Sequence, residues 1–287
     1  MKSQTGQYVV VVAAFVALAV VAPAAAQSEQ TPPAAQPLET ADDPPAQTQS
    51  APRVLLPPAP IRQPYWSASA GFEADTHDSG YGFAGPTYVR PFRPNMAVVA
   101  GANLNYLYYE YPTGGGHTNV RSPGINTRAG LRFGDRNYFQ LAAGPGFKRR
   151  HIEIVDASGA VIESSRNTKV GLNIGADLWV NPTSHSNVFG LASYNTEDQY
   201  LWSRLAFREQ ITNHDWSGGF AHFVGVEAIG QGNQDIRSTQ VGAFFEVAHV
   251  PSSMSVMVRG GYKRSFYDFG PDRTGPWVAI GVWHRLR

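Results

Sequence analysis

From about residue 65 onward the sequence repeats one pattern about a dozen times: roughly ten residues in which apolar and polar side chains alternate, then a turn. Residues 240–247, for example, read QVGAFFEV, and residues 125–133 read INTRAGLRF. Alternation with a period of two is a strand signal, and no stretch follows a helical period instead. Because only a closed barrel can place such strands in lipid without unpaired edges, we predict an all-β fold, an antiparallel outer-membrane β-barrel.

Twelve strands are expected, and the connections between them follow a regular order of lengths. Tight turns at 134–136 and 251–253 follow even-numbered strands, whereas longer loops at 112–118, 151–166 and 267–274 follow odd-numbered ones. This order suits short periplasmic turns and long outer loops, although ten or fourteen strands stay open as alternatives. The expected strands lie near 65–74, 81–90, 96–110, 119–133, 137–150, 160–180 (its first third expected as loop), 187–195, 199–211, 220–230, 236–249, 254–265 and 275–286.

Aromatic residues near the strand ends are expected to form girdles at the two membrane interfaces. These residues are Tyr108, Tyr109, Tyr111, Trp179, Trp202, Trp277 and Trp283.

The chain divides into three parts by composition. Residues 1–26 read as a signal peptide, with an apolar run at 9–21 that is shorter than the roughly 20 residues of a spanning helix and three alanines at 24–26 before the cleavage site. Residues 27–64 are rich in Pro and Ala, which predicts a disordered linker, either a plain spacer or a tether for a periplasmic partner. Residues 65–287 form the predicted barrel, which export would deliver to the outer membrane.

Composition narrows the function classes. The chain has no Cys, which excludes thiol catalysis and thiolate metal sites, and a formal net charge of +1 gives no reason to expect a nucleic-acid partner. A soluble β-sandwich or a soluble barrel would show the same alternation. The signal peptide and the order of loop lengths favour the membrane barrel.

If the apolar faces meet lipid, the alternate polar positions line the lumen. Charges inside a barrel must pair or stay wet, so their first interpretation is a structural network, and their second is a polar path for a substrate such as a glycan. Other polar positions expected inside are Asn103, Asn105, Asn126, Gln140, Asn173, Asp177 and Gln240. The candidates for lumen or glycan contact are Arg128, Arg132, Trp202, Arg204, Arg208, Glu227, Glu246 and Arg259.

No segment meets the requirements of a catalytic or metal site. Residues 76–80 (THDSG) and 213–217 (NHDWS) hold the residue types of a nucleophile site, but both lie in expected connections without a positioned base. The eight His are scattered, and residues 231–235 contain one acid, too few for a calcium loop. We therefore expect no enzyme activity, no catalytic residues, no cofactor and no metal.

Short motifs across residues 66–286 carry a family resemblance. They are Tyr194-Asn195-Thr196, YLWSRL at 200–205, Gly225-Val226-Glu227 with Gly230, residues 237–242, Gly71-Phe72 with Asp75, and YGFAG at 81–85. With these motifs the chain resembles the cellulose biosynthesis proteins of the BcsS type.

The resemblance implies an accessory role in bacterial cellulose, or exopolysaccharide, biosynthesis or export during secretion and biofilm formation. It implies outer-membrane lipid, a glucan chain and components of the cellulose synthase complex as partners, and it carries no catalytic residues. The alternatives are a general porin or structural barrel and, further off, a lipid-modifying barrel enzyme.

Overall fold

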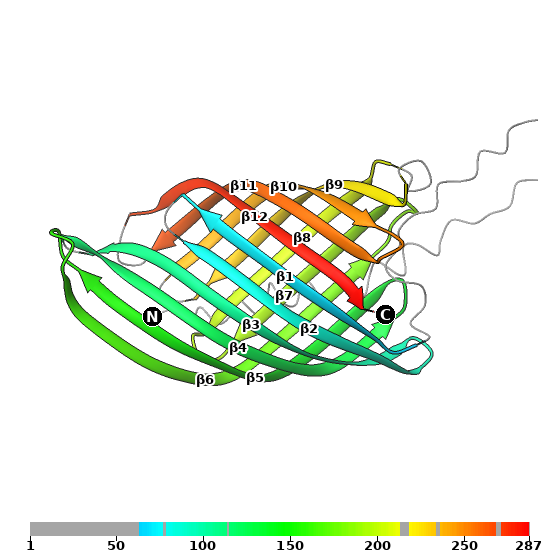
Figure 1. The fold of residues 1–287 in the computed structure, drawn as a ribbon, viewed down its shortest axis with the longest axis horizontal. Coiled ribbons are helices and arrows are strands. Elements are labelled where there is room, and N and C mark those ends of the chain that lie inside the picture. Colours follow the sequence, from blue (N-terminus) through cyan, green and yellow to red (C-terminus); the bar gives the residue numbers. More distant parts are fainter. Residues whose placement is uncertain are drawn as a thin grey trace, which may run out of the picture.

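Twelve antiparallel strands close into a single barrel (Figure 1). The computed structural model describes residues 63–286 apart from 77–78, 114, 213–217, 234–235 and 268–270, so the predicted signal peptide and nearly all of the predicted linker lie outside the described residues. The strands are β1 (Tyr65–Asp75), β2 (Gly80–Arg93), β3 (Met96–Thr113), β4 (Gly116–Gly134), β5 (Tyr138–Val155), β6 (Val161–Val180), β7 (Ser186–Asn195), β8 (Tyr200–Gln210), β9 (Phe220–Gly232), β10 (Ile236–His249), β11 (Met254–Tyr267) and β12 (Arg273–Leu286).

Each strand pairs with its sequence neighbour, and the first strand pairs with the last. Phe72 of β1 lies opposite Ile280 of β12 on one side and Gly82 of β2 on the other. This closure leaves the sheet without an edge along the body of the barrel. The predicted fold class and the count of twelve strands are confirmed.

The two rims of the barrel differ. We call the rim where β1 begins and β12 ends the terminal rim, and the opposite one the hairpin rim. Two tight turns of the terminal rim need a left-handed backbone, at Asn95 (φ 60°) and Gly134 (φ 91°). The amide of Gly134 donates to the carbonyl of Asn95 at 2.8 Å, which ties these adjacent turns together.

Strands β3 to β6 are the longest, with 18 to 20 residues each, and they extend past their neighbours at the hairpin rim (Figure 1). The expected loops at 112–118 and 151–166 were therefore wrong. The register pairs His151 with Arg166 and Glu153 with Ser164, so most of the expected second loop is a β-ladder. Both faces of this part meet solvent, and strands that are polar on both faces lose the alternation by which a sequence reveals a strand.

The barrel is apolar outside and polar inside. Large apolar side chains on its outer face stay exposed, including Leu104 (63%), Val226 (59%) and Val278 (63%). Among the described residues there is no helix long and apolar enough to cross a membrane. An apolar outer surface on a barrel without edges suits the hydrocarbon of a bilayer.

The outer face gives a first prediction. Val226→Arg places a charge at the middle of β9 on the outer face, and we expect it to destabilise the barrel in lipid vesicles by about 2–4 kcal/mol. Ile162→Arg, at an equally exposed position on the projecting part of β6, is the control and is expected to cost close to nothing. Denaturant-induced unfolding from vesicles measures both, and an equal cost would contradict the assignment of the outer face.

Candidate functional site

The polar interior of the barrel is the candidate site. Strand register places all eight candidate residues on the inner face, together with the seven further polar positions expected there. The structure joins most of the candidates into networks. Contact of any of them with a glycan stays a prediction.

The largest network is a chain of charges that connects four strands. Arg204 on β8 donates from Nε to Glu227 Oε2 on β9 at 2.5 Å, and Arg259 NH1 on β11 lies 3.5 Å from the same oxygen. Arg259 NH2 is also 3.7 Å from Glu73 Oε2 on β1, whose other oxygen accepts a hydrogen bond from Gln240 at 2.9 Å. The side chain of Glu227 has 0% exposure, so the two arginines stabilise an otherwise isolated buried charge.

Two smaller networks lie beside this chain. Arg208 binds Glu246 Oε2 at 2.5 Å through NH1 and Asn187 Oδ1 at 2.6 Å through Nε. Arg132 donates to Gln140 Oε1 from Nε at 3.0 Å and from NH2 at 2.8 Å, and its NH1 donates to the Tyr65 hydroxyl at 3.0 Å.

Asp177 belongs to the network of Arg132 and Gln140 as well, because Gln140 Nε2 donates to Asp177 Oδ2 at 2.5 Å. Arg128 faces the same part of the lumen, where its guanidinium approaches the inner side of Gly101 and Gly175.

Aromatic rings fill the space between these charges, which corrects the prediction of interfacial girdles. Trp179, Trp202 and Trp277 point inward, as do Tyr109, Tyr111 and Trp283, and Tyr108 alone of the seven lies on the outer face. Trp277 is 1% exposed and packs with Ile229, with Trp202 against that cluster. The prediction was wrong because it relied on the position of these rings near strand ends. The alternation along each strand already assigned them, apart from Tyr108, to the polar inner face.

Arginine side chains lie over several of these rings. The Trp179 ring stacks on Phe189 at 5.5 Å between centroids, and Phe189 meets Phe244 edge-on at 6.2 Å. The guanidinium carbon of Arg208 is 4.8 Å from the Trp179 centroid, and that of Arg204 is 4.9 Å from the Phe189 centroid. These cation–π contacts add to the ion pairs that hold the arginines.

The interior is packed rather than open at this level. Phe189 on β7 reaches Phe244 on β10, and Arg204 on β8 reaches Met257 Sδ on β11 at 3.4 Å, so side chains bridge strands three apart along the inner wall from β7 to β11. Phe223 and Asn187 on the inner wall have 0% exposure. Among the described residues, therefore, the wall from β7 to β11 offers no continuous wet surface at this level.

The connection between β7 and β8, residues 196–199, forms a second part of the site that sequence reasoning missed. It folds against the inner faces of β5 and β6. The amide of Thr196 donates to the carbonyl of Leu172 at 3.0 Å. Lys169 Nζ lies 2.7 Å and Lys148 Nζ 3.2 Å from the carboxylate of Asp198. No local pattern in the sequence indicates this contact, which depends on one glycine in each receiving strand, Gly146 and Gly171.

The charges around this loop shift one pKa. Partial burial alone would raise the pKa of Asp198, but the hydrogen bond from Lys169 and the positive charges of Lys148 and Lys169 outweigh it, so the pKa falls below its ordinary value. Asp198 is therefore ionised at neutral pH, and its ion pairs hold the loop in place.

The expected nucleophile segments are only partly visible. His77, Asp78 and residues 213–217 lie outside the described residues. Ser79 Oγ donates to Asp75 Oδ2 at 2.5 Å and lies 3.1 Å from Lys263 Nζ, which itself pairs with Asp75 at 2.7 Å. Lys263 Nζ donates to Ser79 Oγ rather than accepting its hydrogen, so it is not placed as a base for this serine. In the part of the chain that the structure describes, no three His, Asp or Glu side chains gather where they could hold a metal ion.

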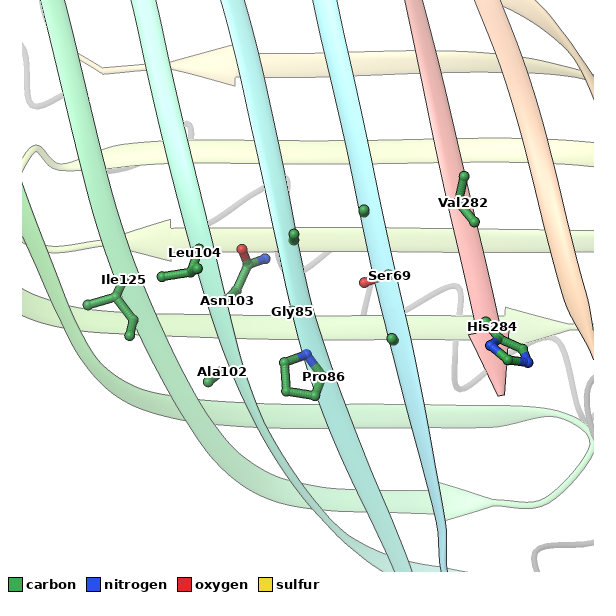
Figure 2. A pocket seen from close by; sticks show the side chains of 12 residues that line it. Ser69, Gly85, Pro86, Ala102, Asn103, Leu104, Ile125, Val282 and His284 are labelled. Carbon is green, nitrogen blue, oxygen red and sulfur yellow. The ribbon is translucent and has the colours of Figure 1, made fainter. Parts of the chain in front are cut away.

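A shallow groove of about 450 Å³ lies on the outside of the barrel, over β12 and β1 to β4. Figure 2 shows Val282 and His284 on one flank and Leu104 and Ile125 on the other. Small residues such as Ala68 and Ala102 form its floor, and almost all of its lining is apolar. This groove belongs to the apolar outer surface, whereas the charge networks lie inside.

Comparison with models of protein families identifies the family of this chain. A family model described as cellulose biosynthesis protein BcsS matches residues 71–286. The comparison with curated proteins gives no match.

Solved structures that are similar include outer-membrane proteins with β-barrels. The beta domain of the Bordetella autotransporter Brka shares 14% identity (TM-score 0.49), with 78% of this chain and 98% of that chain covered. The translocator domain of the autotransporter NalP from Neisseria meningitidis shares 13% identity (TM-score 0.42), with 77% and 88% covered. The CymD monoaromatic hydrocarbon channel shares 10% identity (TM-score 0.41), with 78% and 89% covered.

The central network gives a second prediction. Glu227→Gln leaves Arg204 and Arg259 without their shared carboxylate, and we expect the free energy of unfolding to fall by about 3–5 kcal/mol. Glu153→Gln is the matched control, because Glu153 pairs with the half-exposed Arg121 at 3.9 Å, and its loss is expected to cost at most about 1 kcal/mol. Equal losses in the two variants would show that burial does not set the strength of these pairs.

The Asp198 ion pairs give a third prediction. A carboxylate with a lowered pKa contributes stability that is present above its ordinary pKa of 3.8 and is lost as the pH falls through the lowered value. We expect Asp198→Asn to lower the hydrogen-exchange protection of the Thr196 amide by the same factor at pH 8 and at pH 5. Below the ordinary pKa the difference from the wild type should shrink. A difference that disappears between pH 8 and 5 would contradict the assignment.

Proposed function

Because the chain belongs to the family of cellulose biosynthesis proteins of the BcsS type, we propose that it is an outer-membrane accessory component of cellulose production or export. The apolar outer face supports insertion into the outer membrane, with the terminal rim toward the periplasm and the hairpin rim outward. The family match alone supports the link to cellulose, and the cellulose synthase complex and the glucan chain are the partners that it suggests.

The packed interior is the observation that separates this proposal from a general porin. Buried ion pairs and stacked rings fill the inner wall from β6 to β10 in the described part of the barrel. This filling favours a barrel that organises the glucan or the secretion machinery at its rims over one that stays continuously open. A general porin needs a wet passage lined by exposed polar groups. In planar bilayers we therefore expect the wild-type barrel to pass little current.

The first test is a deletion strain, with and without the restored gene, in which secreted and periplasmically retained cellulose are measured separately. Retained polymer would support a role in export at the outer membrane. Loss of both pools would support a role in assembly that acts back on synthesis. Unchanged pools together with a large steady conductance would overturn the proposal in favour of a porin.

Residue-level involvement of the interior gives a fourth prediction. We expect the double variant Arg204→Ala and Arg208→Ala to lower cellulose output, because it removes the donors that hold Glu227 and Glu246. Arg121→Ala, outside the networks, is the control. Barrel assembly is followed in the same strains by heat-dependent migration on gels, so that loss of the barrel is distinguished from loss of output. Full output from an assembled double variant would exclude a role for these arginines in organising the glucan.

A further inference from the structure

The loop at residues 196–199 rests in a hollow whose floor is made by glycines. Gly146 on β5 and Gly171 on β6 face each other on the inner wall, and Glu197 lies directly over them with 1% of its side chain exposed. A Cβ atom on Gly171 would lie 2.8 Å from Thr196 Oγ1 and 2.9 Å from the amide nitrogen of Glu197, and would overlap Glu197 Oε2. The loop can take this position only because these strands carry no side chains there.

The hollow contains oxygen atoms that lack hydrogen-bond donors. Both carboxylate oxygens of Glu197 and the amide oxygen of Asn126 are buried there, as is the amide oxygen of Asn103, which lies opposite Asn126 on β3. None of the four accepts a hydrogen bond from a described residue. Two of them lie beside the same glycine, because a Cβ on Gly146 would be 2.7 Å from Asn126 Oδ1 and 3.5 Å from Glu197 Oε1. Lys148 Nζ lies 3.8 Å from Glu197 Oε1, beyond hydrogen-bond distance, so these buried acceptors remain without donors. A ligand that brings donors would therefore compete with the ion pairs that hold the loop.

The charges around the hollow indicate which kind of donor it would take. Lys148 and Lys169 carry two positive charges and Glu197 and Asp198 two negative ones, so the cluster is already neutral. A divalent cation would add charge that nothing nearby balances, whereas a neutral polyhydroxyl compound would not. Hydroxyl groups supply the donors that amide and carboxylate oxygens lack.

Aromatic faces stand on the same wall closer to the hairpin rim. The rings of Tyr109 and Tyr111 on the inner face of β3 lie 6.1 Å apart at 24°, and Arg150 donates to the Tyr109 hydroxyl at 2.9 Å. A β-linked glucan has sugar rings that are apolar on their faces and polar at their edges. Aromatic rings can stack on those faces, and the buried oxygens can accept hydrogen bonds from the hydroxyl groups at the edges. The inner wall between Tyr111 and Asn126 thus extends from the hairpin rim to the covered oxygens.

We propose that the loop at residues 196–199 is a displaceable cover over a glucan-hydroxyl site formed on the wall by Asn126 and its cross-strand neighbour Asn103. A glucan segment that enters from the hairpin rim displaces the loop and donates hydroxyl hydrogen bonds to these oxygens. The identity of the ligand rests on the proposed function in cellulose production, whereas the displaceable cover does not.

Cysteine labelling tests the cover, because the chain has no Cys of its own. Asn126→Cys in the otherwise native barrel is treated from outside with a membrane-impermeant thiol reagent. Adding Gly171→Ala wedges the loop away, and we expect labelling to become about tenfold faster or more, because reaction requires the opened state. Gly175→Ala is the matched control on the same strand and face, since its new Cβ would meet no atom closer than 3.7 Å.

A second measurement leaves the Asn126 side chain in place. Hydrogen exchange of the Thr196 amide should accelerate in Gly171→Ala and stay unchanged in Gly175→Ala, with Asn126 left intact. If neither labelling nor exchange responds to the wedge, the loop is a fixed part of the wall and the proposal is overturned.

The ligand is tested with cellohexaose as the probe. With Asn126 intact, we expect cellohexaose to accelerate hydrogen exchange of the Thr196 amide severalfold by holding the loop away from the wall, while maltohexaose leaves the rate unchanged. Exchange that the Gly171→Ala wedge accelerates but cellohexaose does not would overturn the glucan site. This outcome is distinguishable from failure of the proposed function, which the cellulose pools of the deletion strain report independently.

Discussion

The need of every backbone amide and carbonyl for a partner in hydrocarbon is the constraint on which this structure depends. A bilayer supplies no hydrogen bonds, so a sheet that enters it must close. Pairing of β1 with β12 meets that requirement along ten residue pairs, and the alternation of side chains then follows from the pleat. One face of each strand becomes apolar and the other becomes the wall of an enclosed space. The outer surface and the interior are consequences of the same closure.

Enclosure changes what polar residues inside the barrel must do. An arginine in a wet pore can rely on water, but Arg204 and Arg208 are nearly buried and obtain their partners from Glu227, Glu246 and Asn187. Aromatic rings occupy the remaining volume and add contacts to the guanidinium planes. The result is a filled core of charges and rings inside the barrel.

How much the sequence could predict depends on which residues are considered. Strands such as β10 were predicted within a residue, because one face is apolar and the other polar along their whole length. The outer part of β6 was expected as loop because neighbouring residues such as Ser165 and Arg166 put polar side chains on both faces, and only pairing with β5 makes this segment a strand. Trp179 and Trp277 were expected at the interfaces because ring chemistry was weighed above parity. The contacts of Glu197 join segments whose order in the sequence carries no trace of their proximity, so no local pattern could predict them.

The closure described above also sets the order in which the barrel can form. Hairpins such as β5–β6 join residues that are close in the chain, whereas the last seam brings together Phe72 and Ile280, which are 208 positions apart (280 − 72). The loop-closure entropy of that seam is the largest in the molecule, and it is recovered only when the intervening strands are already in place. We therefore expect the seam between β1 and β12 to close last during assembly, and until it does, these two strands would be the unpaired edges of the sheet in the described part of the barrel body.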